Sequence, residues 1–261
     1  MAADIGNTQT VLGLYEGEEL RGRWRMATEA YRTADEIGAS CASLLALRGM
    51  ELEEVTAIFV SSDVPPLLRA YGKLAEDLLK VPFYSVSPEI KTGLVNCYDN
   101  PAQVGSDRIV NSVAVSRLYG LPAIIVDFGT ATSVEAVDAD ANYRGGALMP
   151  GIYISLGALA SRAAKLGDVD LEERTPNAIA TNTADSIRSG FIYGYAGAVD
   201  SLIRRFKEEL GFAPDSPNEF QIIATGGPAP AIVPHCREIK TLDPDLTLKG
   251  LRVLYELNAP A

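Results

Sequence analysis

Histidine is almost absent from this sequence, in which His235 is the only one among 261 residues. It lies in Pro234-His235-Cys236, next to a stretch rich in proline and alanine. A catalytic histidine needs a partner that orients it, so a surface or loop role is the favoured interpretation. Any general base in this protein is therefore expected to be a carboxylate.

Cysteine is scarce too, and Cys41, Cys97 and Cys236 are far apart with no C-x-x-C pair. This spacing favours a reduced, cytoplasmic protein over a disulfide framework, and it makes zinc binding improbable. No run of about 18 apolar residues is present, so no membrane span is expected. The start lacks a basic region followed by an apolar run, so no secretory signal is expected either.

Basic residues are outnumbered, with 23 Lys and Arg against 34 Asp and Glu and a net charge of -11. This balance argues against nucleic acid as the main partner. Any anionic ligand must be held by local dipoles, by local Arg or Lys side chains, and by metal ions. The hydrophobic content of 47% and charged content of 22% are ordinary for a soluble globular enzyme.

Two familiar nucleotide motifs are missing. No G-x-x-x-x-G-K-[ST] occurs, since Lys91-Thr92-Gly93 has such residues in the wrong frame, and this excludes a P-loop kinase. No G-x-G-x-x-G occurs either, so dinucleotide binding has no support.

One short pattern occurs twice, as Asp4-Ile5-Gly6-Asn7-Thr8-Gln9-Thr10-Val11 and as Asp127-Phe128-Gly129-Thr130-Ala131-Thr132-Ser133-Val134, about half the chain apart. Each copy is typical of a strand end, a tight turn and the next strand. Such a turn offers backbone N–H groups and hydroxyls to an anion, beside a carboxylate that can hold a cation. Two turns facing each other would grip a nucleotide triphosphate and its metal. A chance match, or plain β-turns, is the alternative.

Strands and helices alternate in both halves, which predicts an α/β fold with mixed sheets flanked by helices. The length suits one large or two small domains, and a boundary near 118–121 predicts two lobes, 1–118 and 119–261. Strands are expected at 10–15, 20–26, 55–61, 81–86, 123–127, 133–137 and 222–224, after a weak or clipped first strand. Helices are expected from the capping box at 33–36, from Pro65-Pro66 through 67–79, and at 106–120, 152–165, 183–210 and 248–257. A loop is expected over 87–104, a sharp connection at 145–151, and irregular chain over 166–181.

Asp4 and Asp127 are each expected to close a buried strand, where a carboxylate is costly unless it is paired or holds a cation. Capping of the turn amides is the alternative to a metal site. Gly105-Ser106-Asp107-Arg108 opens a helix, where an acid and a base side by side could orient a hydroxyl and bind a carbonyl or carboxylate. Ordinary helix capping explains these residues equally well. Thr225-Gly226-Gly227 follows a strand and could pass close to an adenine ring, although this signal is weak.

Small residues recur every four positions along the helix expected at 183–210, at Ser186, Gly190, Gly194 and Ala198. They form a smooth face that lets another backbone approach closely. That backbone could belong to the same chain or to a second subunit.

Taken together, these residues resemble type III pantothenate kinase. The matching motifs follow the order of that family along nearly the whole chain, and they are Asp4-Ile5-Gly6-Asn7-Thr8, Tyr98-Asp99-Asn100-Pro101, Gly105-Ser106-Asp107-Arg108, Asp127-Phe128-Gly129-Thr130-Ala131-Thr132, Gly145-Gly146 with Pro150-Gly151, Asn182-Thr183 and Thr225-Gly226-Gly227. The resemblance implies two ribonuclease-H-like domains of the actin-like ATPase superfamily, which agrees with the repeat. It also implies ATP-dependent phosphorylation of pantothenate to 4'-phosphopantothenate, the first step of coenzyme A biosynthesis.

The resemblance assigns a role to each candidate residue. It implies that Asp107 accepts the proton of the pantothenate hydroxyl, and that Tyr98, Gly105, Ser106 and Arg108 line the substrate. It implies that the triphosphate is held by Thr130 and by Asp4, Ile5, Gly6, Asn7, Thr8, Gln9, Thr10 and Val11. Asp4 is then expected near Mg²⁺, and Asp127 is expected to bind a monovalent cation, K⁺ or NH₄⁺. The family is dimeric, so Thr183 is expected to reach the substrate site of the other subunit.

The sequence departs from the family pattern at Ala180-Thr181, at Pro228 and at Asp63, where an apolar residue is more usual. Two other functions stay open on the sequence alone. One is a related kinase that acts on a sugar or a carboxylate. The other is a regulatory relative that keeps the fold and has lost catalysis.

Overall fold

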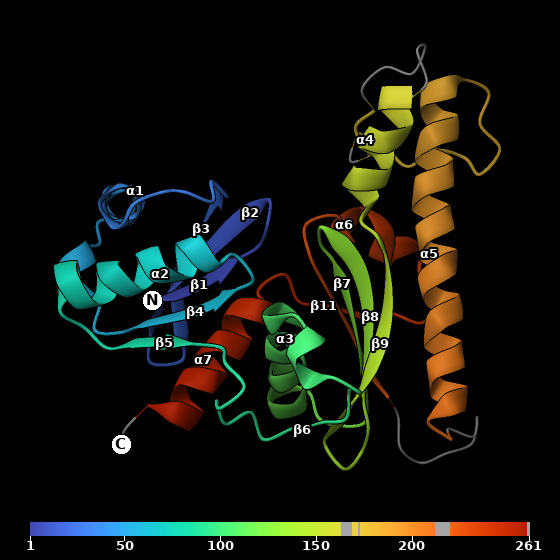
Figure 1. Cartoon of the computed structure of the whole chain (residues 1–261). Coiled ribbons are helices and arrows are strands. Elements are labelled where there is room, and N and C mark those ends of the chain that lie inside the picture. The colour runs from blue at the N-terminus through green and yellow to red at the C-terminus, as the bar shows by residue number, and fades with distance from the viewer. Residues whose placement is uncertain (163–168, 172, 212–219, 260–261) are drawn as a thin grey trace. The chain divides into compact units, whose positions relative to one another are not determined.

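The computed structural model describes residues 1–162, 169–171, 173–211 and 220–259, which form two compact units (Figure 1). The first unit comprises Met1–Leu94, Asp99–Arg117 and Leu246–Ala261, and the second comprises Val95–Tyr98 and Leu118–Asp245. The expected division into 1–118 and 119–261 places its boundary beside the passage from Arg117 to Leu118. The expected division did not assign Leu246–Ala261 to the first unit or Val95–Tyr98 to the second.

The first unit contains a five-stranded sheet in the order β3-β2-β1-β4-β5. Its strands are β1 (Ala2–Ile5), β2 (Gln9–Glu16), β3 (Glu19–Ala27), β4 (Ile58–Ser62) and β5 (Phe83–Ser85). Its helices are α1 (Ala34–Ala46), α2 (Pro65–Lys73), α3 (Ser106–Leu118) and α7 (Leu246–Asn258), with short helical turns at Leu52–Glu54, Leu74–Leu79 and Pro101–Gln103. Side chains alternate along β1, so Ala3 and Ile5 pack with α1 and α2, while Ala2 packs with α3 and α7.

The second unit contains a six-stranded sheet in the order β11-β10-β7-β8-β9-β6. Its strands are β6 (Val95–Asn96), β7 (Ala123–Phe128), β8 (Ala131–Val137), β9 (Asn142–Pro150), β10 (Gln221–Thr225) and β11 (Thr241–Leu242). Its helices are α4 (Ile152–Arg162), α5 (Thr183–Glu209) and α6 (Ala229–Ile232), with a turn at Val233–His235. The long helix α5 runs along the sheet in Figure 1 and buries Ile192, Val199 and Ile203 in the same core as Val126 of β7.

The same strand pattern is therefore built twice. The order β3-β2-β1-β4-β5 in the first unit corresponds to β9-β8-β7-β10-β11 in the second, and each central strand has an antiparallel neighbour before it and a parallel one after it. In each unit, the repeated turn joins the two strands of the equivalent hairpin, β1 and β2 in the first unit and β7 and β8 in the second. The turns differ by one residue, because Ile5 pairs with Thr10 whereas Phe128 pairs with Thr132. The prediction of an α/β fold with mixed sheets is confirmed, and the repeat is structural.

Several local expectations hold and others are wrong. The capping box at Thr33 and Glu36 is present at the start of α1. The first strand is not weak, since every residue of β1 pairs with both β2 and β4. The helix expected to open at Pro65-Pro66 begins there as an α-helix, and Leu74–Leu79 continues it as a π-helix.

The prediction of a sharp connection at 145–151 is wrong, because Asn142–Pro150 forms one strand, β9. This strand position requires glycine, because a Cβ at Gly146 would sit 2.1 Å from the carbonyl oxygen of Val134 on β8. The irregular chain expected over 166–181 contains no helix or strand at its described positions, while 163–168 and 172 lie outside the described residues. Among the helices that the structure describes, none has the length and apolar character needed to span a bilayer.

Candidate functional site

The first predicted phosphate turn projects from the ends of β1 and β2. The N–H of Gly6 donates to the carbonyl of Gln9 at 3.0 Å, which closes the turn. Asn7, Thr8 and Gln9 are exposed, whereas Ile5 is buried in the core below them. The Thr10 hydroxyl is also buried and lies 2.9 Å from the hydroxyl of Thr28. The exposed part of this turn can therefore meet a ligand, and Ile5 and Thr10 support it from beneath.

Asp4 lies next to the start of α3. It pairs with Ser61 of the parallel strand β4 and shares the sheet face of Ala2, on which α3 and α7 pack. The hydroxyl of Ser61 lies 2.9 Å from the hydroxyl of Ser106, at the start of α3. The first unit thus gathers the first turn and the segment that carries Asp107 at one end of its sheet.

The start of α3 is held by a residue that the sequence analysis had not assigned to the site. A carboxylate oxygen of Asp63, Oδ1, accepts from the backbone N–H of Ser106 at 3.3 Å and from its hydroxyl at 3.2 Å. Asp107 is partly exposed and accepts the N–H of Arg108 at 2.7 Å, while Arg108 itself is buried. Asp63 lies in the connection between β4 and α2, more than 40 residues before α3, so only the folded chain shows that it caps α3.

The second predicted turn is fixed by two close backbone approaches within the second unit. The N–H of Gly151 donates to the carbonyl of Thr130 at 3.1 Å, and a Cβ at Gly151 would lie 2.1 Å from that oxygen. A Cβ at Gly226 would lie 2.3 Å from the carbonyl oxygen of Phe128, and Gly226 has a φ of +100°. Gly129 and Thr130 remain exposed between these two supports. The shape of this turn therefore depends on glycine at both positions.

These contacts change the interpretation of the Thr225-Gly226-Gly227 motif. Gly226 is explained by its approach to the backbone of Phe128, with no ligand required. Gly227 is exposed, and a Cβ there would meet nothing within 4 Å, so this glycine is the one with open space beside it. Asp127 pairs with Thr225 on one side and Ser133 on the other, at the base of the turn.

Tyr98 belongs to the second unit, whereas Gly105–Arg108 belongs to the first. Its ring packs on Gly145, where a Cβ would come within 3.3 Å of two ring atoms, and it tilts against the ring of Tyr143 at 6.4 Å. The Tyr143 hydroxyl donates to the buried carboxylate of Glu135 at 2.5 Å. The Gly145-Gly146 pair thus makes room for Tyr98 on one side and for Glu135 on the other.

Thr183 is the first residue of α5 and is exposed. The side chain of Asn182 caps the helix by accepting the N–H of Asp185 at 2.9 Å. Buried Arg188 ties the preceding chain to this end of the helix, because it donates to Asp185 at 3.0 Å and to the carbonyl of Asp170 at 2.7 Å. The position of Thr183 is therefore anchored, while its side chain is exposed.

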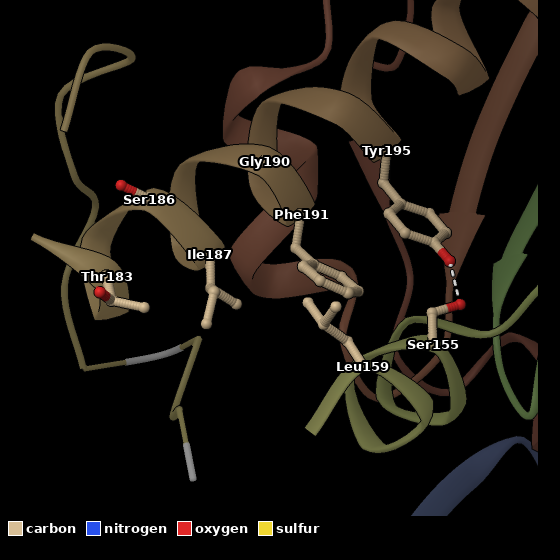
Figure 2. Close-up of a pocket in the computed structure, with 8 residues that line it drawn as sticks. All are labelled: Ser155, Leu159, Thr183, Ser186, Ile187, Gly190, Phe191 and Tyr195. Carbon is tan, nitrogen blue, oxygen red and sulfur yellow. Dashed lines mark hydrogen bonds between the residues drawn. The ribbon is translucent and has the colours of Figure 1, made fainter. Parts of the chain in front are cut away.

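A shallow groove of about 400 Å³ lies between α4 and α5, and Figure 2 shows its lining. The residues that line it are Ser155, Leu159, Thr183, Ser186, Ile187, Gly190, Phe191 and Tyr195. The hydroxyls of Ser155 and Tyr195 lie 2.8 Å apart across it. Added Cβ atoms at Gly190 and Gly194 would meet nothing within 4 Å. The small-residue face of α5 is thus uncovered by the described part of the chain.

Other chemistries find little support. Burial raises the pKa of Cys41 to about 12, and burial with nearby Asp200 raises the pKa of Cys236 to about 12, so both stay thiols. His235 packs edge-on against the Tyr193 ring at 5.1 Å. Over the described ranges, no three His, Cys, Asp or Glu side chains gather into a metal-binding group. A divalent ion would have to complete its coordination with ligand oxygens and water, as Mg²⁺ commonly does on phosphates.

The comparisons with known proteins identify the family. The model of the type III pantothenate kinase family matches residues 1–205. A type III pantothenate kinase from Rubrobacter xylanophilus is 64% identical over 259 residues, which are 99% of this chain and 98% of that protein. The chain belongs to the type III pantothenate kinase family. It is therefore a kinase, with ATP as its phosphoryl donor.

Solved structures show the fold. A Campylobacter jejuni protein described as a Baf family transcriptional activator superimposes with a TM-score of 0.58 at 15% identity, covering 98% of each chain. The activator of 2-hydroxyisocaproyl-CoA dehydratase from Clostridium difficile, with bound ADPNP, gives a TM-score of 0.53 at 12% identity, covering 98% of this chain and 93% of its own. These likenesses show that the chain shares its α/β fold with both proteins.

The support of the second turn by Gly151 can be tested directly. Gly151→Ala forces Thr130 away from its position, so we expect the KM for ATP to rise by about tenfold or more. Gly157→Ala is the matched control, since a Cβ at this position of α4 would meet nothing within 4 Å. Steady-state kinetics with varied ATP measure both. An unchanged KM in Gly151→Ala would show that the turn does not hold the nucleotide.

Proposed function

We propose that Asp107 acts as the proton acceptor in the reaction of this family, the ATP-dependent phosphorylation of pantothenate to 4'-phosphopantothenate, which begins coenzyme A biosynthesis. The observation that carries this assignment is the position of Asp107 in the first turn of α3, partly exposed and next to the strand end that carries Asp4. Phosphoryl transfer has a loose transition state, so positioning and charge neutralisation supply most of the rate. One carboxylate that aligns the hydroxyl and finally takes its proton is enough, and no histidine is needed.

The two turns bind the triphosphate in this proposal. Asp4–Val11 offers the exposed Gly6–Gln9 segment, and Thr130 offers its hydroxyl and the exposed backbone of the second turn. Backbone N–H groups in such turns suit phosphate oxygens because they carry partial positive charge without a basic side chain. This agrees with a chain whose net charge is -11.

Pantothenate is bound in this proposal by Tyr98 and by Gly105–Arg108. Arg108 is only 8% exposed, so its guanidinium is poorly solvated and suited to a carbonyl or carboxylate of the substrate. Tyr98 supplies a flat apolar wall, held by its packing on Gly145. Gly105 leaves space beside the Asp107 carboxylate, which a Cβ would approach to 2.7 Å.

Two cations complete the proposed site. Asp4 suits Mg²⁺, which usually takes one or two protein carboxylates and fills its remaining positions with phosphate oxygens and water. Asp127 suits K⁺ or NH₄⁺, because its carboxylate turns toward the second turn and lies 3.5 Å from where a Gly129 Cβ would be. When bound, such ions offset the phosphate charge that an acidic protein would otherwise repel.

A homodimer is the final part of the proposal, with Thr183 reaching the substrate site of the partner. It is supported by the uncovered glycines of α5, by the exposed Leu159 that lines the groove, and by three more exposed apolar residues, Tyr153 and Ile154 on α4 and Ile179 before α5. Apolar surface gathered in this way is typical of a subunit contact. A cytoplasmic location is proposed as well, supported by three cysteines that all remain free thiols.

The role of Asp107 predicts a specific kinetic defect. Asp107→Asn keeps the shape of the side chain and removes the basic oxygen, so kcat is expected to fall by about a hundredfold or more while the KM for ATP changes little. A coupled ATP-consumption assay with pantothenate measures both quantities. Normal turnover in this variant would remove Asp107 from its role. Turnover of the wild-type chain with a sugar instead of pantothenate would favour a related kinase, and no turnover with any substrate would favour a regulatory relative.

The monovalent site predicts a dependence on potassium. Asp127→Asn removes the charge that holds the ion, so we expect most of the activation by K⁺ over Na⁺ to disappear. Asp140→Asn is the control, since Asp140 is an exposed carboxylate in the turn between β8 and β9 of the same unit. Kinase rates in matched chloride salts give the comparison. An equal potassium response in wild type and Asp127→Asn would place the cation elsewhere.

The contribution of Thr183 across the dimer predicts complementation. A dimer built from one Asp107→Asn chain and one Thr183→Ala chain regains one intact site, so about half of the wild-type activity is expected. Each variant alone should be impaired at both sites. Co-expression with two affinity tags and purification through both isolates the mixed dimer. If Thr183 served its own chain, the mixed dimer would have no intact site and would stay impaired.

A further inference from the structure

The residue just before α3 has no side chain that could cap the helix. Helices leave their first N–H groups without a partner inside the helix, and a side chain just before the helix usually accepts one of them. Here that position is Gly105, which has no side chain. Asp63 instead reaches in from the connection between β4 and α2 and accepts both the N–H and the hydroxyl of Ser106.

The Asp63 and Asp107 carboxylates are close neighbours. A Cβ at Gly105 would lie 3.1 Å from Oδ2 of Asp63 and 2.7 Å from Oδ1 of Asp107, so these two oxygens are at most about 6 Å apart. The donors at the start of α3 are divided between them: Asp63 takes the two of Ser106, and Asp107 takes the N–H of Arg108. A third contact, between the hydroxyls of Ser61 and Ser106, ties this turn to β4.

We propose that Asp63 is a positioning residue for the reaction, acting on Asp107 through Ser106. By holding the N–H and hydroxyl of Ser106, it fixes the first turn of α3 near the end of β4. The position of Asp107, the next residue of that turn, is fixed with it, so its carboxylate is oriented toward the substrate hydroxyl. This inference rests on the proposed role of Asp107, and it gives a function to a residue that departs from the family pattern.

Two substitutions of Asp63 separate the hydrogen bonds from the charge. Asp63→Ala removes the acceptor, and we expect kcat to fall by about tenfold, the rate equivalent of one lost helix cap, with an unchanged KM for ATP. Asp63→Asn keeps an acceptor oxygen at the same place, so kcat should stay within about twofold of wild type. A kcat for Asp63→Asn as low as that of Asp63→Ala would overturn the proposal, because the charge would then be what matters.

A matched cap elsewhere in the first unit controls for general destabilisation. Thr33 caps α1 by accepting the N–H of Glu36 at 3.3 Å, so Thr33→Ala removes a cap of the same kind from a helix outside the site. We expect its thermal midpoint to fall about as much as that of Asp63→Ala, while its kcat stays at the wild-type value. An equal loss of kcat in both variants would mean that Asp63 acts through stability alone.

The pathway through Asp107 is tested in the Asp107→Asn background. If Asp63 acts by positioning Asp107, Asp63→Ala should cause no further loss of kcat in that background. A further tenfold loss would show that Asp63 acts elsewhere. The two proposals fail in different ways. If the proposed role of Asp107 is wrong, Asp107→Asn alone turns over normally. If only the role of Asp63 is wrong, Asp107→Asn alone is still impaired.

Discussion

The structure depends on one pairing that is made twice. In each unit, an aspartate near the end of a central strand lies beside a hydroxyl residue of the next parallel strand, Asp4 beside Ser61 and Asp127 beside Thr225. On its other side, each central strand pairs with an antiparallel neighbour. The turn between these two strands follows the aspartate and carries the exposed backbone. Carboxylate, hydroxyl and turn are thereby fixed at the same edge of a sheet. The remaining helices cover the faces and hold that edge in place.

The two copies are supported in different ways. The first turn is backed by the buried Thr10–Thr28 hydroxyl contact, and the nearby α3 is held to β4 by Ser61 and Asp63. The second turn is supported by close backbone contacts, where Gly151 and Gly226 leave no room for a side chain. A side-chain support can be replaced by another acceptor, whereas a backbone support tolerates only glycine. The second turn is thus the less adaptable of the two.

Much of this could be predicted from local sequence, because a capping box, a strand that ends in Asp-x-Gly and an apolar period each arise within a few residues. The features that were missed depend on neighbours far along the chain. Gly145-Gly146 suggested a turn, yet both glycines lie in β9 to accommodate Tyr98 and Glu135. Asp63 had no assigned role, and it caps a helix more than 40 residues later. Local patterns predict elements, but they do not show which element a polar side chain will serve.

Acidity and phosphate binding are compatible here because the site separates its charges. In the proposed site, the exposed backbone of the turns meets the phosphates, so no cluster of basic side chains is needed, and the buried Arg108 serves the other substrate. The carboxylates of the proposed site serve the cations and one proton. This division also explains why a second carboxylate at the start of α3 is tolerated, since Asp63 is satisfied by two donors of Ser106 and does not compete for those that Asp107 uses.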